Sequence, residues 1–486
     1  MKLIIRNVRG LPAPWVWAVF AFLVFTLAPV ISEVMRFYEL RRFFDLSVAS
    51  GCYVLVVIIS AGLIGIGIRQ VEEKERRIQR LERWEPPVIR GTGDEVSEAF
   101  KKLDLPEHIP ILERLFRDHN EVVLKKRFSG GYKNSGVFLV GHPPHLVDCV
   151  VKFAPSKDIK EELDRRRLIE GRLGNAGGRY LSHDIGPHDN APGAVVYTLA
   201  GFGEAESLLD FAEFYGQMRD LRTISGLVTR LFTRVLPHSG EKTAGPLRLF
   251  EEYSRLARKL PNITIAVQDH PDLAHVRVPD AQVTVALPGV GDVTLRNPLN
   301  WTHTTFQTNL RNHTETDAYA GIVHGDLHSG NILIELPQLN IWIIDFARTR
   351  QGHTLDDFCR LEADIKFVLT GVAGGKQDPD VKRFFQQAYE FEKTVLSPTS
   401  ARKLSLTMLV NPSQDPQFGK AWECVAAIRD EATNHLVGPS IYPYYLGLLH
   451  ATLPVMYYAP EQCNRWQKLY AFVSAGLICE RLDRVP

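Results

Sequence analysis

The chain has few of the residues that mark a disulfide or zinc framework. Its 486 residues include six cysteines, which are scattered and form no Cys-x-x-Cys pair. Such cysteines are typical of buried thiols in a reducing compartment. The formal net charge is only +1, and no basic stripe is interleaved with aromatic residues, so no nucleic-acid partner is expected. A Walker A motif is also missing, because Gly374-Gly375-Lys376-Gln377 has neither its spacing nor its hydroxyl residue.

Charge is absent from two segments near the N-terminal end, residues 10–32 and 46–68. Because a helix of about 20 apolar residues spans the hydrocarbon core of a bilayer, we expect a transmembrane helical hairpin over residues 1–68, with spans at about 11–32 and 46–68. Basic residues flank the spans, mainly on the C-terminal side, which predicts a multi-pass membrane protein with both termini and the remaining chain in the cytoplasm. A signal peptide or a hairpin buried in a globular domain are the alternatives.

Residues 69–114 are expected to connect this hairpin to the rest of the chain. Within them, residues 70–84 are predicted to form a short charged helix at the membrane surface, where their basic side chains suit anionic lipids. Pro86 and Pro87 would end that helix, because proline cannot continue it. Membrane lipid is therefore an expected partner.

The most informative pattern combines His-Gly-Asp-Leu-His-Ser-Gly-Asn at residues 324–331 with Ile-Ile-Asp-Phe-Ala at residues 343–347. An apolar β-hairpin pattern separates the two blocks. Phosphoryl transfer from Mg-ATP needs one carboxylate to orient the attacking hydroxyl and accept its proton. It also needs an amide oxygen and a second carboxylate to hold the metal.

This chemistry assigns a role to each polar residue of the pattern. Asp326 is the predicted catalytic base, and Asn331 and Asp345 are the predicted Mg²⁺ ligands. His324 is expected to be a buried brace that hydrogen-bonds the backbone of the loop. The alternative is a surface loop in which the same Asp and Asn side chains cap turns.

The two blocks resemble those of the aminoglycoside phosphotransferase and choline kinase branch of the protein-kinase-like superfamily. The run from Arg348 to Glu362 is similar to a bacterial subset, the ternary-complex-associated kinase-like domains. The resemblance covers about residues 115–480. It implies a two-lobed α+β fold, with a small β-rich lobe over 115–202 and a large, mainly helical lobe over 203–486. It also implies ATP- and Mg²⁺-dependent phosphorylation of a hydroxyl group.

A kinase reading requires a glycine-rich turn and then a strand lysine. Gly130, Gly131 and Gly136 lie in a turn between two apolar runs, where glycine lets the backbone approach phosphates closely. A plain glycine hairpin is the alternative for this turn. One hairpin later, Lys152 ends a strand pattern and is the predicted phosphate-binding lysine, with an exposed edge-strand lysine as the alternative.

The lysine needs a glutamate from the following helix, predicted over residues 159–173. Distance from Lys152 favours Glu170, with Glu162 close behind. The strand pattern at residues 194–202 then predicts a hinge, in which adenine binds the backbone from Thr198 to Gly201. Ser207 is a candidate cap for the first helix of the large lobe.

Between hinge and catalytic loop we expect a helix over residues 214–236 and a β insertion over about 262–296 that holds acceptor specificity. After the second block, Arg348 is a candidate for stabilising transition-state charge. Thr354 or Asp356 could cap the helix that follows.

Two other functions remain open at this stage. The domain could bind nucleotide as a regulatory or signalling module with weak catalysis, or it could be a protein kinase. Gly325 replaces the arginine that pairs with a phosphorylated activation loop in regulated protein kinases, which favours a small-molecule hydroxyl over a protein hydroxyl as acceptor.

Overall fold

The computed structural model describes residues 86–91, 105–128, 136–142, 145–169, 179–198, 208–236, 242–406, 409–411, 413 and 415–484. The two predicted spans and the helix expected at 70–84 lie outside these residues. Within the described residues, no helix is both long and apolar enough to cross a membrane. The 18-residue helix at Arg465–Leu482, for example, includes charged residues and packs into the core. The predictions of a membrane-spanning hairpin and a multi-pass membrane location are therefore not supported, and the fold class is corrected to its two-lobed α+β part.

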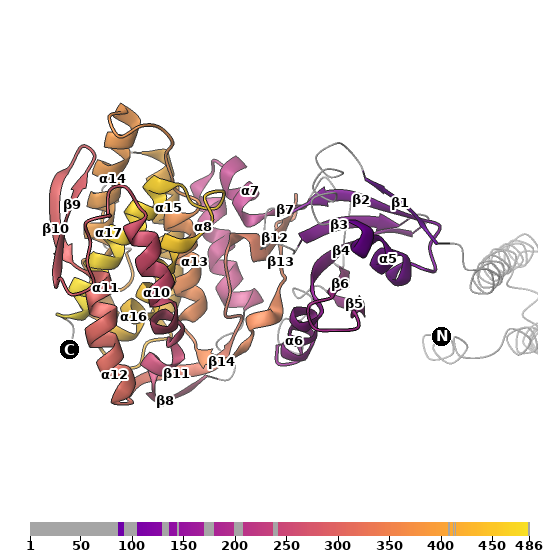
Figure 1. Ribbon diagram of the computed structural model, residues 1–486, viewed down its shortest axis with the longest axis horizontal. Helices are drawn as coiled ribbons and strands as arrows, with labels where there is room; N and C mark the ends of the chain where they lie inside the picture. Colours follow the sequence, from indigo (N-terminus) through magenta and orange to yellow (C-terminus); the bar gives the residue numbers. More distant parts are fainter. Residues whose placement is uncertain are drawn as a thin grey trace, which may run out of the picture. The chain divides into compact units, whose positions relative to one another are not determined.

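The smaller lobe is built on a six-stranded sheet. Its strands are β1 (Val88–Gly91), β2 (Glu121–Arg127), β3 (Gly136–His142), β4 (His145–Pro155), β5 (Arg179–Asp184) and β6 (Pro192–Thr198). They lie in the order β1-β2-β3-β4-β6-β5, and only β1 and β2 are parallel. Because β1 joins the sheet, the lobe begins before the boundary expected at residue 115. Figure 1 shows this sheet with its helices α5 (Leu105–Leu115) and α6 (Ser156–Arg166).

Side chains of β4 alternate between the two faces of the sheet. Cys149, Val151 and Phe153 pack on one face with Ile111 and Leu112 of α5. The residues between them, including Val150 and Lys152, belong to the other face.

That other face meets the larger lobe through a small sheet of β7 (Leu208–Asp210), β12 (Ile332–Glu335) and β13 (Asn340–Ile343), in the order β13-β12-β7. Val150 lies in one hydrophobic cluster with Leu333, Trp342 and Ile344. The alternation of β4 therefore directs Lys152 toward the segment that carries the two motif blocks. Strands β12 and β13 pair antiparallel and confirm the hairpin predicted between the two motif blocks.

The larger lobe is mainly helical. Its helices are α7 (Phe211–Gln217), α8 (Leu221–Arg230), α9 (Leu249–Glu252), α10 (Arg255–Gln268), α11 (Pro298–Trp301), α12 (Gln307–Arg311), α13 (Asp356–Phe367), α14 (Pro379–Val395), α15 (Pro416–Thr433), α16 (Tyr442–Thr452) and α17 (Arg465–Leu482). A further sheet has three strands, β8 (Thr243–Leu247), β11 (Thr316–Val323) and β14 (Arg350–His353). In the sequence, β8 and β11 come before the loop at residues 324–331, and β14 comes after it.

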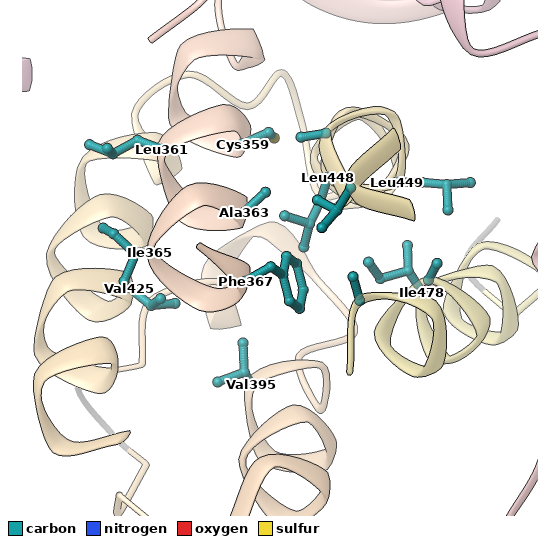
Figure 2. Packing of buried hydrophobic residues seen from close by; sticks show 14 of the residues in the cluster. Cys359, Leu361, Ala363, Ile365, Phe367, Val395, Val425, Leu448, Leu449 and Ile478 are labelled. Carbon is teal, nitrogen blue, oxygen red and sulfur yellow. The ribbon is translucent and has the colours of Figure 1, made fainter. Parts of the chain in front are cut away.

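Helix α13 is the centre of this lobe. Every one of its side chains except that of Arg360 is buried. Figure 2 shows its apolar side chains reaching α15 on one side and α16 and α17 on the other. A helix enclosed in this way is a rigid support for the polar residues that it carries.

The β insertion is smaller than predicted, because residues 262–267 belong to α10. This segment is rich in β-branched residues, but Leu260, Ile263 and Val267 recur at helical spacing and are buried, whereas Ile265 is 58% exposed. Burial of one helical face thus outweighs strand propensity here. The hairpin of β9 (Gln282–Leu287) and β10 (Gly291–Arg296) is present as predicted.

The helix expected over residues 214–236 is broken between α7 and α8. Asp220 ends the gap by accepting the backbone N–H groups of Arg222 and Thr223, as an N-cap does. Helix α7 begins with a capping box formed by Asp210 and Glu213, whereas the predicted cap, Ser207, lies outside the described residues.

Candidate active site

The loop at residues 324–331, which is predicted to be catalytic, follows β11 and begins at His324, whose side chain is completely buried. Its Nε2 lies 3.0 Å from the carbonyl oxygen of Ile344, and its Nδ1 accepts the backbone N–H of Asp326 at 3.4 Å. One tautomer satisfies both contacts, with the proton on Nε2. His324 therefore connects the first motif block to the strand end that delivers Asp345, which is the bracing geometry expected of it.

Two carboxylates of α13 accept hydrogen bonds from backbone N–H groups of the same loop. Asp357 accepts the N–H groups of His324 and Gly325, both at 2.8 Å, and Asp364 accepts the N–H of Ser329, also at 2.8 Å. The two carboxylates are seven residues apart, so they lie on one face of the helix. The loop is thus fixed at both ends by a helix whose side chains are buried except for that of Arg360.

Gly325 has a φ of +77°, a left-handed conformation that favours glycine. A Cβ atom there would collide with the backbone carbonyl of Arg348. Close packing of the loop against the segment after Asp345 therefore explains why the chain has His-Gly-Asp at this point.

Asp326 lies between two guanidinium groups. Its Oδ1 accepts Arg348 Nη1 at 2.7 Å and Arg360 Nη1 at 3.3 Å. Burial alone would raise the pKa of Asp326, but the two arginines outweigh it and lower the pKa below its ordinary value. The carboxylate is therefore ionised at neutral pH, as a proton acceptor must be.

Asn331 and Asp345 offer oxygen atoms of the kind that Mg²⁺ binds. The Asn331 amide nitrogen donates to the Asp326 carbonyl at 2.9 Å, which leaves its oxygen for other partners. Asp345 has a φ of 65°, a strained conformation that clusters at functional sites. Both residues line one cavity, and two oxygen donors suffice for a metal that takes its other ligands from phosphates and water.

Lys152 is held between the lobes by two carboxylates. Its Nζ lies 2.7 Å from Glu162 Oε2 and 2.6 Å from Asp345 Oδ1. Tyr197 donates its hydroxyl hydrogen bond to the other Glu162 oxygen, which also accepts the N–H of Phe346. Burial disfavours the charged forms of both Lys152 and Asp345. The mutual attraction prevails, so the pKa of Lys152 is raised and that of Asp345 is lowered to about 2.

Of the two glutamates predicted to pair with Lys152, Glu162 is the one in contact, and the favoured residue, Glu170, lies outside the described residues. Gly130, Gly131 and Gly201 lie outside them as well. Gly136 is the first residue of β3, at the end of the predicted turn. Thr198 is the last residue of β6 and does not line the cavity.

The residues that do meet surround a cavity of about 380 Å³ between the lobes. Lys152, Asp326, Asn331 and Asp345 all line it, which brings the strand lysine and both motif blocks together. Arg348 lines it too. The structure gives Thr354 and Asp356 no capping role, because α13 has no side-chain cap. Asp356 instead pairs with Arg350 and Arg360.

Sequence reasoning gave no role to Tyr197, Asp357 or Asp364. The spacing of the two aspartates, two helical turns apart, was a usable signal for their common face. Nothing in the sequence indicates that Tyr197 reaches Glu162, because that contact depends on how β6 and α6 pack.

Two buried histidines near the loop, His353 and His450, predict that the folded chain loses stability at acidic pH. Burial, the largest effect for each, lowers the pKa of His353 to about 4 and that of His450 to about 3, against an ordinary value of 6.5. Below pH 6.5 the unfolded chain therefore binds protons that the folded chain does not. The free energy of unfolding should fall from pH 6.5 to 4, by about 3 kcal/mol for each histidine.

Urea denaturation at a series of pH values between 7.5 and 4 measures this effect. The double substitution His353→Gln with His450→Gln should flatten the dependence below pH 6.5, since no histidine is left to titrate at either position. A pH dependence that is identical in the variant and the natural chain would contradict the assignment.

Comparisons with known proteins found a match to one family and distant likenesses to solved structures. A family described as ternary complex associated domain 9 matches residues 284–441. An aminoglycoside phosphotransferase solved with ADP and hygromycin B is 13% identical, with 76% of this chain and 97% of that chain covered and a TM-score of 0.37. Choline kinase LicA from Streptococcus pneumoniae is 13% identical, with 71% and 98% covered and a TM-score of 0.32. An aminoglycoside-3'-phosphotransferase of type VIII is 15% identical, with 62% and 91% covered and a TM-score of 0.27.

No curated protein matches the chain by sequence. The solved structures are distant likenesses, so the function has to be argued from the residues of this chain.

Proposed function

We propose that the chain is an ATP- and Mg²⁺-dependent phosphotransferase of the aminoglycoside phosphotransferase-like type, which transfers the γ-phosphate to an acceptor hydroxyl. The observation that carries this proposal is the position of Lys152. It contacts Glu162 and Asp345 beside a cavity that Asp326 and Asn331 also line. A strand lysine, its helix glutamate, a base and two metal ligands are the parts that phosphoryl transfer needs.

In this proposal, the residues of each lobe divide the work. The small lobe, ending near residue 202, supplies Lys152 to the α- and β-phosphates, and Glu162 keeps the lysine in place. The glycine-rich turn and the hinge from Thr198 to Gly201 would hold the phosphates and the adenine. The large lobe, from residue 203, supplies the base and the acceptor site.

The transfer itself is a single displacement. The acceptor hydroxyl oxygen forms a bond to the γ-phosphorus, and the bond from that phosphorus to the β–γ bridging oxygen breaks, so ADP leaves. The hydroxyl proton passes to the Asp326 carboxylate. His324 and Asp357 keep the backbone of Asp326 in position, and the ionised state of Asp326 prepares it for the proton.

Mg²⁺ would be held by the Asn331 amide oxygen and the Asp345 carboxylate, and when bound it neutralises phosphate charge. In the structure, the Lys152 ammonium is paired with Oδ1 of Asp345. ATP should therefore draw the Lys152 ammonium toward its phosphates and leave Asp345 for the metal.

The glutamate provides a direct test of this site. Glu162→Gln should weaken ATP binding roughly tenfold, since a charge-assisted contact to Lys152 is lost. The matched control is Glu161→Gln, which changes the adjacent residue, a half-exposed carboxylate with only surface partners. Calorimetric titration of ATP with Mg²⁺ into the full chain measures both variants. Equal affinities for the two variants would contradict the role of Glu162.

A further inference from the structure

The cavity beside Asp326 is rich in cations that the nucleotide site does not use. Arg348 and Arg360 contact Asp326 directly, and Arg255 and Lys259 of α10 also line the cavity. Arg255 and Lys259 are four residues apart, so they lie on one face of the helix. Both are half-buried, and neither has an ion-pair partner within the described part of the chain.

Three carboxylates other than that of Asp345 line the cavity beside these four cations, and two of the three already have partners. Apart from Asp345, the cavity is lined by Asp326, Asp364 and Glu461. Asp326 is already shared by two arginines, and Asp364 accepts the backbone of Ser329. Of these three carboxylates, Glu461 is exposed and takes part in none of these contacts. A positively charged acceptor would therefore meet four like charges and only one carboxylate that is free of these contacts.

The contact between the arginines and Asp326 points the same way. An acceptor hydroxyl must reach the Asp326 carboxylate, whose Oδ1 is taken by Arg348 and Arg360. An anionic group next to that hydroxyl would give Arg348 a further partner, because guanidinium pairs with phosphate or carboxylate in a two-point geometry. Arg360 would keep its contact with Asp356. The same molecule could thus bring the anion and free the base.

We propose that the acceptor is a small hydroxylated anion, bound through a phosphate or carboxylate group by Arg255, Lys259 and Arg348 while its hydroxyl meets Asp326. This inference rests on the proposed phosphotransferase function and adds the chemical class of the substrate. Tyr457 and Tyr458 also line the cavity and provide ring surfaces for the uncharged body of such a molecule.

The test uses the full chain saturated with Mg²⁺ and the non-hydrolysable analogue AMP-PNP. Four probes on one three-carbon skeleton are titrated by calorimetry: glycerol 3-phosphate, glycerate, glycerol and 3-amino-1,2-propanediol. The anionic probes should bind saturably and at least about tenfold more tightly than glycerol, since each gains charge-assisted contacts. The amine should not bind. The inference would be overturned if neither anion bound saturably. It would also be overturned if glycerol or the amine bound as tightly as the anions.

Two substitutions assign the binding to this cavity. Arg255→Gln and Lys259→Gln should each weaken glycerol 3-phosphate about tenfold. Arg258→Gln is the control, because Arg258 lies on the same helix but is exposed and does not line the cavity. Equal loss in Arg258→Gln would overturn the inference. Failure of the natural chain to bind Mg-AMP-PNP would instead sink the proposed function itself, whereas AMP-PNP binding without anion preference sinks only the substrate class.

Discussion

Replacing Asp326 by asparagine should lower the rate of ADP formation from Mg-ATP by about 10²–10⁴-fold, the usual contribution of a positioned general base. Asparagine has nearly the same shape and keeps the backbone carbonyl that accepts the Asn331 amide, but it cannot take the proton of the attacking hydroxyl. Water can serve as the acceptor, so the rate is measurable before the natural acceptor is identified.

Affinity for ATP should not change in this variant, since Asp326 contacts neither Lys152 nor the side-chain oxygens predicted to bind metal. The matched control is Asp317→Asn, an exposed aspartate on the strand that leads into the loop. If Asp326→Asn forms ADP as fast as the Asp317→Asn control, the base has been assigned to the wrong residue.

The second large effect is on stability. Arg429 of α15 donates two hydrogen bonds to Glu362 of α13, at 2.8 and 2.6 Å, and both side chains are fully buried. Arg429→Met should lower the free energy of unfolding by about 3–5 kcal/mol, because it leaves a buried carboxylate without its main partner. Urea denaturation at pH 7.5 measures the change.

The double variant Glu362→Met with Arg429→Met separates a lost ion pair from lost packing. Removing both charges should recover most of the stability, since a buried pair costs nearly as much desolvation as it gains in attraction. Recovery should be incomplete, because Tyr444 also donates to Glu362 and would lose its partner. A loss under about 1 kcal/mol in Arg429→Met alone would contradict this account of how α13 is held.

That Asp326, Asn331 and Asp345 lie together could be predicted from the sequence, because they are close along the chain. A turn and a short hairpin separate Asp326 from Asp345, so the motif itself fixes most of their geometry. The sequence predicts a place beside them for Lys152 for a similar reason, since this lysine follows one hairpin after the predicted turn and strand alternation sets its face.

Contacts between distant segments could not be read in this way. Glu162 meets Lys152 because α6 packs on β6, where Tyr197 also contacts the Glu162 carboxylate, and no local pattern records that packing. The segment at residues 262–267 has strand-forming residues but is helical. Ile263 and Val267 are buried, whereas Ile265, which a strand would place on the same face, is exposed. The role of Asp357 likewise depends on α13 passing behind the catalytic loop.

The central claim is that Lys152, Asn331 and Asp345 form a site for Mg-ATP. Calorimetric titration of ATP into the full chain, with and without Mg²⁺ and beside Asp345→Ala, tests it most directly. We expect binding in the micromolar range that depends on Mg²⁺ and is lost in the variant. An absence of ATP binding by the folded natural chain, or binding of equal strength in Asp345→Ala, would contradict it.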